Sequence, residues 1–211
     1  MEWSQIPLGP LQTNCYVLSL ENNTCLIFDP GEESEKLISF IQQKQLKPLA
    51  IILTHAHFDH IGAVDDIRGE YSIPVYVHKL EADWLVDPKL NGSLKYEMIK
   101  TVKGKPADHL IDAEQEMMIG DFRFQILETP GHSPGSISLY FDEAQLLVSG
   151  DALFNGSIGR TDLPGGNYNQ LLKSIHEKLL VLPEETIVMS GHGSVTTIGQ
   201  EMDTNPFLHG F

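Results

Sequence analysis

Short apolar runs separated by polar loops follow one another along the chain, and their spacing predicts a mixed α/β fold. The run Leu-Ala-Ile-Ile-Leu at residues 49–53 has no polar position, which is typical of a strand buried on both faces. Leu37, Phe40 and Ile41 instead recur at helical spacing. By these criteria we expect strands over residues 14–20, 24–28, 49–53, 73–78, 122–127, 136–141, 146–148 and 186–189, and helices over residues 33–44, 61–68, 79–86 and 171–179.

Strand groups alternate with helices in both halves of the chain, which predicts two sheets with helices outside. A length of 211 residues fits one domain with a sizeable core, so we expect a single domain over residues 1–211. No apolar run approaches the ~20 residues of a membrane span. The N-terminus lacks a basic region followed by an apolar core, so we expect a cytoplasmic protein with no membrane partner.

Two helix boundaries have sequence signals. Gly69 is the expected stop of the helix at residues 61–68. Asn167 or Asn169 is the expected cap of the helix marked by Leu171, Leu172, Ile175 and Leu179.

Charge limits the classes of partner. The chain has 14 basic and 29 acidic residues and a formal net charge of −15, which argues against a nucleic-acid partner because its phosphates would be repelled. Lysines gather in one segment, where Glu97 is the only acid between Leu90 and Lys105. This segment is either a solvated surface or an electropositive entrance for an anionic substrate, formed by Lys100, Lys103 and Lys105.

The two cysteines do not form a disulfide framework. The predicted hairpin turn places Cys25 opposite a position near Ser19 and well away from Cys15. We therefore expect two small buried residues and no bridge.

The loop after the buried strand contains the densest candidate chemistry. Its sequence is Thr54-His55-Ala56-His57-Phe58-Asp59-His60, with three imidazoles and a carboxylate within one turn. Neutral imidazole and carboxylate are ligands that zinc and other divalent ions accept. These ligands exceed what one tetrahedral ion needs once distant ligands are added, so the run indicates two metals or one metal with spare ligands.

Three later loops also place a candidate ligand soon after an apolar strand. These ligands are His132, Asp151 and His192, each close to glycines that permit tight turns. A lone histidine after a strand is more often structural. Four such loops in one chain are hard to explain without metal.

This order of motifs resembles the metallo-β-lactamase superfamily. The resemblance rests on the His-x-His-x-Asp-His run followed by Pro-Gly-His, Gly-Asp and Gly-His, and it extends from Asp29-Pro30-Gly31 to Gly191-His192-Gly193. Residues 129–136 and Gly159-Arg160-Thr161-Asp162 are most similar to the small glyoxalase II-like (hydroxyacylglutathione hydrolase-like) enzymes. The resemblance implies a four-layer αββα sandwich with a two-metal site at the sheet edges.

The resemblance also implies a set of seven metal ligands. It assigns His55, His57 and His132 to a first metal, Asp59, His60 and His192 to a second, and Asp151 to both as a bridge. Asp29 would orient this set without binding metal. The cofactors would be two divalent ions, with zinc preferred and iron or manganese also suited to these ligands.

The implied reaction is hydrolysis of a small-molecule acyl thioester of the hydroxyacylglutathione type. A water bridging the metals, with its pKa lowered from ~15.7 towards ~7, would be the nucleophile, and Asp59 would orient it. A thiol of pKa ~8.5 leaves without a strong general acid. No Ser-His or Cys-His nucleophile is apparent in the sequence.

One departure from the family concerns the thiol carrier. Glyoxalase II enzymes usually have a C-terminal helical extension that holds the glutathione carboxylates, and the expectation for this chain is that the extension is missing. Another carrier, or recognition by Lys100, Lys103 and Lys105, would replace it. Arg160 could shape the substrate mouth, although an ion pair with Asp162 is the favoured role.

The main alternative is a persulfide dioxygenase, which shares the fold but uses a single iron held by residues matching His55, His132 and Asp151. Phe58 and the Pro-Gly-Gly after Asp162 favour the hydrolase. Hydrolysis of a lactone or a β-lactam is also chemically possible at the same site. A non-catalytic metal-binding module is disfavoured because no ligand is missing.

The remaining histidines match no ligand position of the family. We expect His176 to lie on the surface of its helix, and His78 to serve packing more than the orientation of the site. The other two are His109 and His209.

Overall fold

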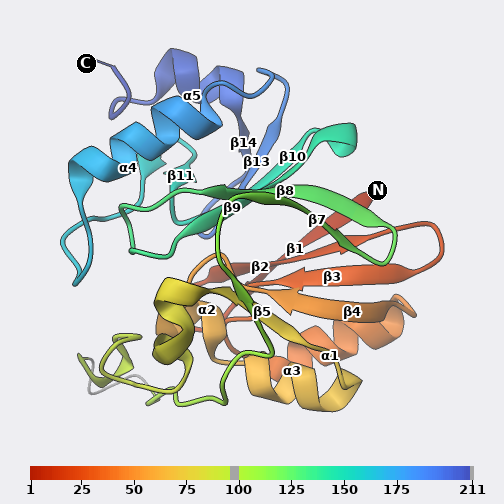
Figure 1. Cartoon of the computed structure of the whole chain (residues 1–211). Coiled ribbons are helices and arrows are strands. Elements are labelled where there is room, and N and C mark those ends of the chain that lie inside the picture. Colours follow the sequence, from red (N-terminus) through yellow and green to blue (C-terminus); the bar gives the residue numbers. More distant parts are fainter. Residues whose placement is uncertain (96–99, 210–211) are drawn as a thin grey trace. The chain divides into compact units, whose positions relative to one another are not determined.

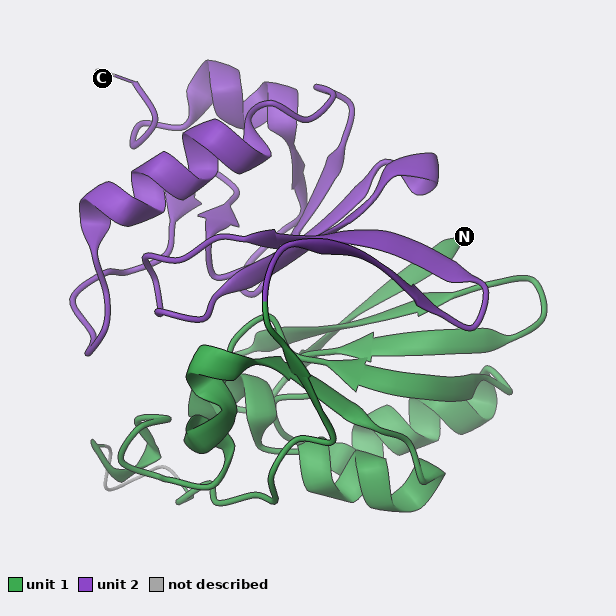
Figure 2. Cartoon of the chain, viewed as in Figure 1, with its two compact units in different colours: residues 1–112 green, residues 113–211 purple. Residues whose placement is uncertain are grey.

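The computed structural model describes residues 1–95 and 100–209 (Figure 1). Residues 96–99, which include Glu97 of the lysine-rich segment, and residues 210–211 lie outside the described residues. The chain divides into two compact units, residues 1–112 and 113–211 (Figure 2). In the described ranges the fold is mixed α/β, with a six-stranded sheet in each unit, as expected. The single domain stays a prediction.

The first unit contains a sheet with the strand order β1-β2-β3-β4-β5-β6. Strands β1 to β3 pair antiparallel, and β3 to β6 pair parallel. The strands are β1 (Glu2–Leu8), β2 (Thr13–Ser19), β3 (Thr24–Phe28), β4 (Lys47–Ile52), β5 (Val75–His78) and β6 (His109–Ile111). The helices are α1 (Ser34–Gln43), α2 (Phe58–Ile61), α3 (Val64–Tyr71) and the 3₁₀ helices η1 (Lys79–Leu85) and η2 (Ser93–Lys95).

Three parallel strands of this sheet end at the edge where the histidine run lies. Asp29 follows β3, the histidine run follows β4, and β5 ends at His78. The carboxyl ends of parallel strands meet at the same edge of a sheet. Helices α1 and α3 cover one face of this sheet, where Leu37 and Ile67 join its hydrophobic core (Figure 1).

The second unit contains a sheet with the order β14-β13-β10-β9-β8-β7 and a separate β11-β12 hairpin. Its strands are β7 (Gln115–Ile119), β8 (Phe122–Glu128), β9 (Ile137–Phe141), β10 (Leu146–Gly150), β11 (Leu153–Phe154), β12 (Ser157–Ile158), β13 (Ile187–Ser190) and β14 (Thr196–Thr197). Its helices are η3 (Asp142–Ala144), α4 (Tyr168–Ser174), the π-helical turn η4 (Ile175–Leu179) and α5 (Ile198–Thr204).

Strand directions bring the second set of candidate ligands together as well. β9 pairs antiparallel with both β8 and β10, and β10 pairs parallel with β13, so β8, β10 and β13 run in one direction. His132, Asp151 and His192 follow these three strands. The same topological rule therefore gathers ligands in each unit.

The helix predicted over residues 61–68 is wrong in its bounds. The chain instead forms α2 and α3, separated at Gly62. A Cβ on Gly62 would lie 2.1 Å from the carbonyl oxygen of Gly31, so this turn packs directly on the turn after β3. Gly69 lies inside α3, which ends instead at Ser72 in the left-handed conformation.

Other elements also depart from the pattern. Helix α5 and strands β1, β6, β7, β11, β12 and β14 were not predicted; β1 contains Pro7, and the other strands are short or weakly apolar. The helix predicted over residues 79–86 is the 3₁₀ helix η1. His176, expected on the surface of its helix, is half-buried, with its ring nitrogen Nε2 turned inward.

Several local predictions are confirmed. Asn167 caps α4 by accepting a hydrogen bond from the Gln170 amide at 3.0 Å. Cys25 pairs with Ser19 across the β2–β3 ladder, and both cysteines are buried free thiols. Within the described residues, no helix combines the length and apolar character needed to cross a membrane; the cytoplasmic location stays a prediction.

The Gly69→Ala substitution should raise the free energy of unfolding by about 0.5–1 kcal/mol, measured by urea denaturation. A Cβ at this helical position would meet no atom within 4 Å, so the gain in helix propensity comes without a clash. Gly62→Ala is the matched control, and overlap with the Gly31 carbonyl should lower stability by about 1–3 kcal/mol. Equal effects of the two substitutions would contradict this account of the helix break.

Candidate metal centre

Asp29 connects the ends of two strands in the first unit. The residue is buried and adopts a positive φ of 48°, which turns its carboxylate back toward the end of β4. Its Oδ1 accepts a hydrogen bond from the Thr54 amide at 2.8 Å. Its Oδ2 accepts from the Thr54 hydroxyl at 2.6 Å and from His60 Nδ1 at 3.0 Å. Asp29 therefore lies where it was expected, beside a candidate ligand.

These hydrogen bonds determine which nitrogen of each ring can bind metal. The Thr54 hydroxyl has one proton, which it gives to Asp29, so it accepts from His55 Nδ1 at 3.1 Å. His60 Nδ1 likewise donates to Asp29. Both rings are therefore protonated at Nδ1 and present Nε2 as a neutral donor, and both Nε2 atoms are buried.

The other two candidate ligands of the run are also held by neighbours. The ring of His57 lies perpendicular to that of His55, with centroids 4.9 Å apart, and 5.4 Å from the ring of Trp84. Asp59 Oδ2 accepts a hydrogen bond from the Thr13 hydroxyl at 2.8 Å and lies 3.5 Å from His60 Nε2. The first unit thus brings all four ligands of the run together.

The second unit brings its three candidate ligands around one oxygen atom. His132 Nδ1 donates to the main-chain carbonyl of Arg160 at 2.8 Å, which leaves Nε2 as the donor for metal. That Nε2 lies 3.6 Å from Asp151 Oδ2. His192 Nε2 lies 3.6 Å from the same oxygen.

The separations between donor atoms fit a shared cation. A tetrahedral ion bound at ~2.0–2.1 Å holds its ligand atoms ~3.3 Å apart, whereas nitrogen–oxygen hydrogen bonds are ~2.7–3.2 Å long. The 3.5 and 3.6 Å separations at Asp59 and Asp151 exceed the hydrogen-bond range and approach the distance between two ligands. Three of the histidines have their other ring nitrogen engaged, so each donor set is suited to a divalent ion.

Gly131 explains the glycine in the Pro-Gly-His motif. Its φ is +135°, and a Cβ would lie 2.3 Å from the backbone nitrogen of Leu171 in α4. The loop can therefore pack on this helix only with glycine at this position. His132 follows immediately, so the same contact fixes where its ring leaves the backbone.

Neither cysteine takes part in the chemistry of the site as a thiolate. Burial raises the pKa of Cys25 to about 12. Burial also raises the pKa of Cys15 well above its ordinary value, and the neighbouring Asp29 charge adds to this effect. Both thiols are neutral near pH 7, so histidine and carboxylate remain the donor types.

The Arg160 side chain forms the ion pair expected for it. Its Nε and Nη2 donate to the two carboxylate oxygens of Asp162 at 2.8 and 2.7 Å. Both side chains are exposed, so this pair contributes little to stability. The main-chain carbonyl of Arg160, which holds His132, is the part of the residue that touches a candidate ligand.

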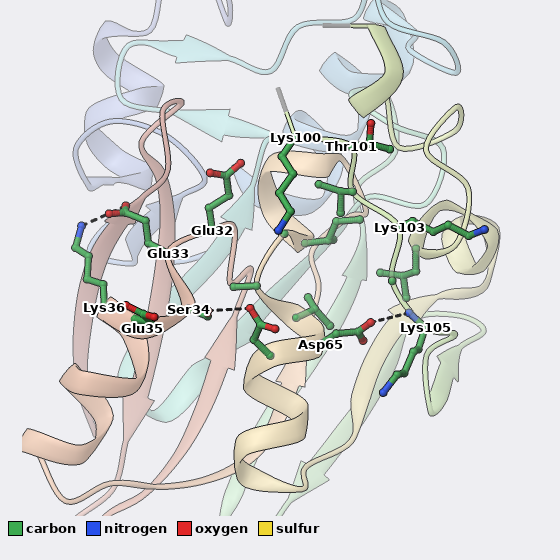
Figure 3. A pocket seen from close by; sticks show the side chains of 18 residues that line it. Glu32, Glu33, Ser34, Glu35, Lys36, Asp65, Lys100, Thr101, Lys103 and Lys105 are labelled. Carbon is green, nitrogen blue, oxygen red and sulfur yellow. Dashed lines mark hydrogen bonds and ion pairs between the residues drawn. The ribbon is translucent and has the colours of Figure 1, made fainter. Parts of the chain in front are cut away.

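The three candidate substrate-binding lysines line a cavity of about 590 Å³ in the first unit (Figure 3). Lys100 extends into the cavity, whereas Lys103 points away from it (Figure 3). Carboxylates also line it, from Glu32, Glu33, Glu35, Asp65 and Asp66. The cavity therefore has both signs of charge, and no predicted metal ligand is among its lining residues.

Sequence reasoning missed the residues that support the ligands. Thr13, Thr54, Glu81 and Trp84 touch the histidine run or its backbone. Thr54 had a signal, because it stands between the strand end and the first histidine. The other three come from separate elements, and no local spacing connects them to the run. His78 caps η1 and is buried, in agreement with a packing role.

The family model for the Metallo-beta-lactamase superfamily matches residues 8–192. The chain belongs to the metallo-β-lactamase superfamily. This confirms the predicted family, and the two sheets with their helices agree with its fold.

Three relatives indicate the range of activities near this chain. The hydroxyacylglutathione hydrolase GloC of Haemophilus influenzae is 37% identical over 205 residues, covering 97% of this chain and 96% of GloC. The crystal structure of the BLEG-1 B3 metallo-beta-lactamase is 58% identical, with a TM-score of 0.97 and coverage of 99% and 100%. TTHA1623, solved in a di-iron-bound form, is 40% identical, with a TM-score of 0.88 and coverage of 97% and 100%. Family and relatives together indicate a metal-dependent, hydrolase-type enzyme.

Asp29→Asn should lower the affinity for divalent metal by about 10- to 100-fold, measured by competition with a chelator. The amide nitrogen would face either the Thr54 amide or the pair of donors at Oδ2, so one side of the residue loses its acceptor. Asp66→Asn, at an exposed residue whose carboxylate accepts a hydrogen bond from the Ser34 hydroxyl, is the control. Equal affinities in both variants would contradict the role given to Asp29.

Proposed function

We propose that the seven donors hold two divalent cations and that the protein hydrolyses small acyl thioesters. His55, His57 and His132 would hold one cation, and Asp59, His60 and His192 the other. The observation that carries this proposal is Asp151 Oδ2, which is 3.6 Å from both His132 Nε2 and His192 Nε2. One carboxylate oxygen at the same distance from two imidazole donors fits the arrangement expected of a bridging ligand.

The chain's own residues then have distinct tasks. Bound divalent cations would polarise a carbonyl group and supply hydroxide at neutral pH by lowering the pKa of water. Asp59 is proposed both as a ligand and as the residue that orients the attacking water. The hydrogen bond from Thr13 occupies Asp59 Oδ2 and fixes the rotation of the carboxylate.

A thioester is the substrate class best supported. GloC, whose name describes a hydroxyacylglutathione hydrolase, matches nearly the full length of this chain. A thiolate leaves without a strong general acid, and this agrees with a donor set made only of imidazoles and carboxylates. Zinc is the proposed metal, and the di-iron form of TTHA1623 makes iron the alternative to test.

β-Lactam hydrolysis is a second candidate, favoured by the 58% identity to the BLEG-1 lactamase. Both reactions attack a carbonyl carbon, but the amide nitrogen of a β-lactam is a poorer leaving group than a thiolate. Hydrolysis of a thioester therefore needs less help from a general acid than hydrolysis of a β-lactam. A single-iron persulfide dioxygenase is the redox alternative.

Purified protein should contain about two divalent ions per chain and hydrolyse hydroxyacyl thioesters. His57→Ala should abolish this hydrolysis and lower metal content, because it removes a proposed ligand. Metal analysis, thioester turnover, β-lactam turnover and oxygen consumption with a persulfide are measured on the same sample. His109→Ala, at an exposed histidine outside the ligand set, is the control.

Each result has a defined meaning. One iron per chain with oxygen consumption would replace the hydrolase with the dioxygenase. Turnover of β-lactams alone would replace the thioester with a lactam. Full hydrolysis by the His57→Ala protein would contradict the ligand assignment itself.

We further propose that Lys100 contacts an anionic thiol carrier, and its extension into the cavity supports this choice over Lys103 and Lys105 (Figure 3). Lys100→Glu should raise KM for an anionic thioester by about 5- to 10-fold at low salt, with kcat unchanged and the effect reduced at 1 M salt. Lys44→Glu, an exposed reversal outside the cavity, is the control. An unchanged KM in the Lys100 variant would contradict the proposal.

A further inference from the structure

The peptide between His55 and His57 is held by a buried carboxylate from another element. Glu81 lies in η1, and its Oε2 accepts a hydrogen bond from the Ala56 amide at 2.6 Å. The side chain is 0% exposed. Ala56 stands between two proposed ligands, so this one bond constrains the backbone from which both imidazoles project.

The helix that carries Glu81 is itself anchored. His78 caps its first turn by accepting from the Leu80 amide. At its other end, the carbonyls of Trp84 and Leu85 accept from Asn91 Nδ2 at 3.0 Å and from the Gly104 amide at 2.8 Å. Hydrogen bonds therefore hold both ends of the helix that carries Glu81.

The same helix touches the histidine run a second time. The ring of Trp84 lies 5.4 Å from the ring of His57. η1 therefore holds this part of the run at two points, the Ala56 amide and the His57 ring. Asp29, by contrast, acts on His60 directly and on His55 through Thr54. The run is thus supported from two separate elements.

The negative charge of Glu81 indicates a second role, besides accepting the hydrogen bond of the Ala56 amide. A buried carboxylate has a large desolvation cost, and a neutral acceptor could also take the hydrogen bond of the Ala56 amide. Imidazole binds metal in its neutral form, so a divalent cation held by His55 and His57 would keep its full charge in a buried setting. A carboxylate bonded to the intervening peptide offsets part of that charge.

We propose that Glu81 is a positioning residue for the His55–His57 pair and that its charge favours metal binding there. This inference rests on the proposed two-metal centre. It adds an acidic residue outside the ligand set whose loss weakens metal binding without removing a ligand.

The test compares Glu81→Ala and Glu81→Gln in the full chain loaded with Co²⁺. Chelator competition gives the affinity of each metal, and the visible d–d spectrum reports the coordination geometry. Glu81→Ala should lower the affinity for one Co²⁺ by about 10- to 100-fold and alter the spectrum. Glu81→Gln, whose amide oxygen still accepts from Ala56, should keep the wild-type spectrum with a smaller loss of affinity.

Leu37→Ala is the stability control, since it truncates a fully buried core residue of α1 away from the run. It should lower thermal stability with no change in Co²⁺ affinity or spectrum. Wild-type affinity in both Glu81 variants, or an equal loss of affinity in the Leu37 variant, would overturn the inference and leave the two-metal centre intact. If Glu81→Ala fails to fold, unchanged affinity in Glu81→Gln alone would overturn the role of charge. A wild-type chain that binds fewer than two Co²⁺ would overturn both the inference and the proposed centre.

Discussion

Hydrogen bonds to the Nδ1 atoms of the imidazoles are the constraint on which the candidate chemistry depends. In the first unit, Asp29 accepts a hydrogen bond from His60 Nδ1. It also accepts the only hydroxyl proton of Thr54, so the Thr54 oxygen accepts in turn from His55 Nδ1. In the second unit a main-chain carbonyl does the same for His132. Each acceptor forces the proton onto Nδ1 and leaves Nε2 for metal. A histidine cluster of the same composition without these acceptors would present a mixture of tautomers and orientations.

The fold supplies these acceptors through strand direction. In each sheet, parallel strands end at one edge, so residues far apart in sequence reach the same place from neighbouring strands. Asp29 and the histidine run follow β3 and β4, and Asp151 and His192 follow β10 and β13. The close packing of Gly62 on Gly31 then fixes the loops that follow β3 and β4 against each other. Strand direction and tight loop contacts together position the candidate donors.

The sequence singled out the candidate ligands, which stay a prediction, but not the residues that contact them. His55 to His60 form a dense local motif, and the glycine-containing loops at His132, Asp151 and His192 recur after apolar strands, so local patterns were enough to select them. Thr13 and Glu81 contact the run across 46 and 25 positions of the chain, and no periodicity encodes such pairings. The break at Gly62 lies at a contact with Gly31, which only the tertiary structure shows. The carboxylates that line the cavity with the lysines come from distant segments of the chain. Counting charges within the lysine-rich segment alone therefore did not reveal them.

The contact between His132 and residue 160 runs through a carbonyl group that every amino acid possesses. The contact therefore does not depend on which side chain stands at this position. A survey of side-chain substitutions would not reveal the contribution of this carbonyl. Replacing the following peptide bond by an ester, which weakens the carbonyl as an acceptor, would expose that contribution.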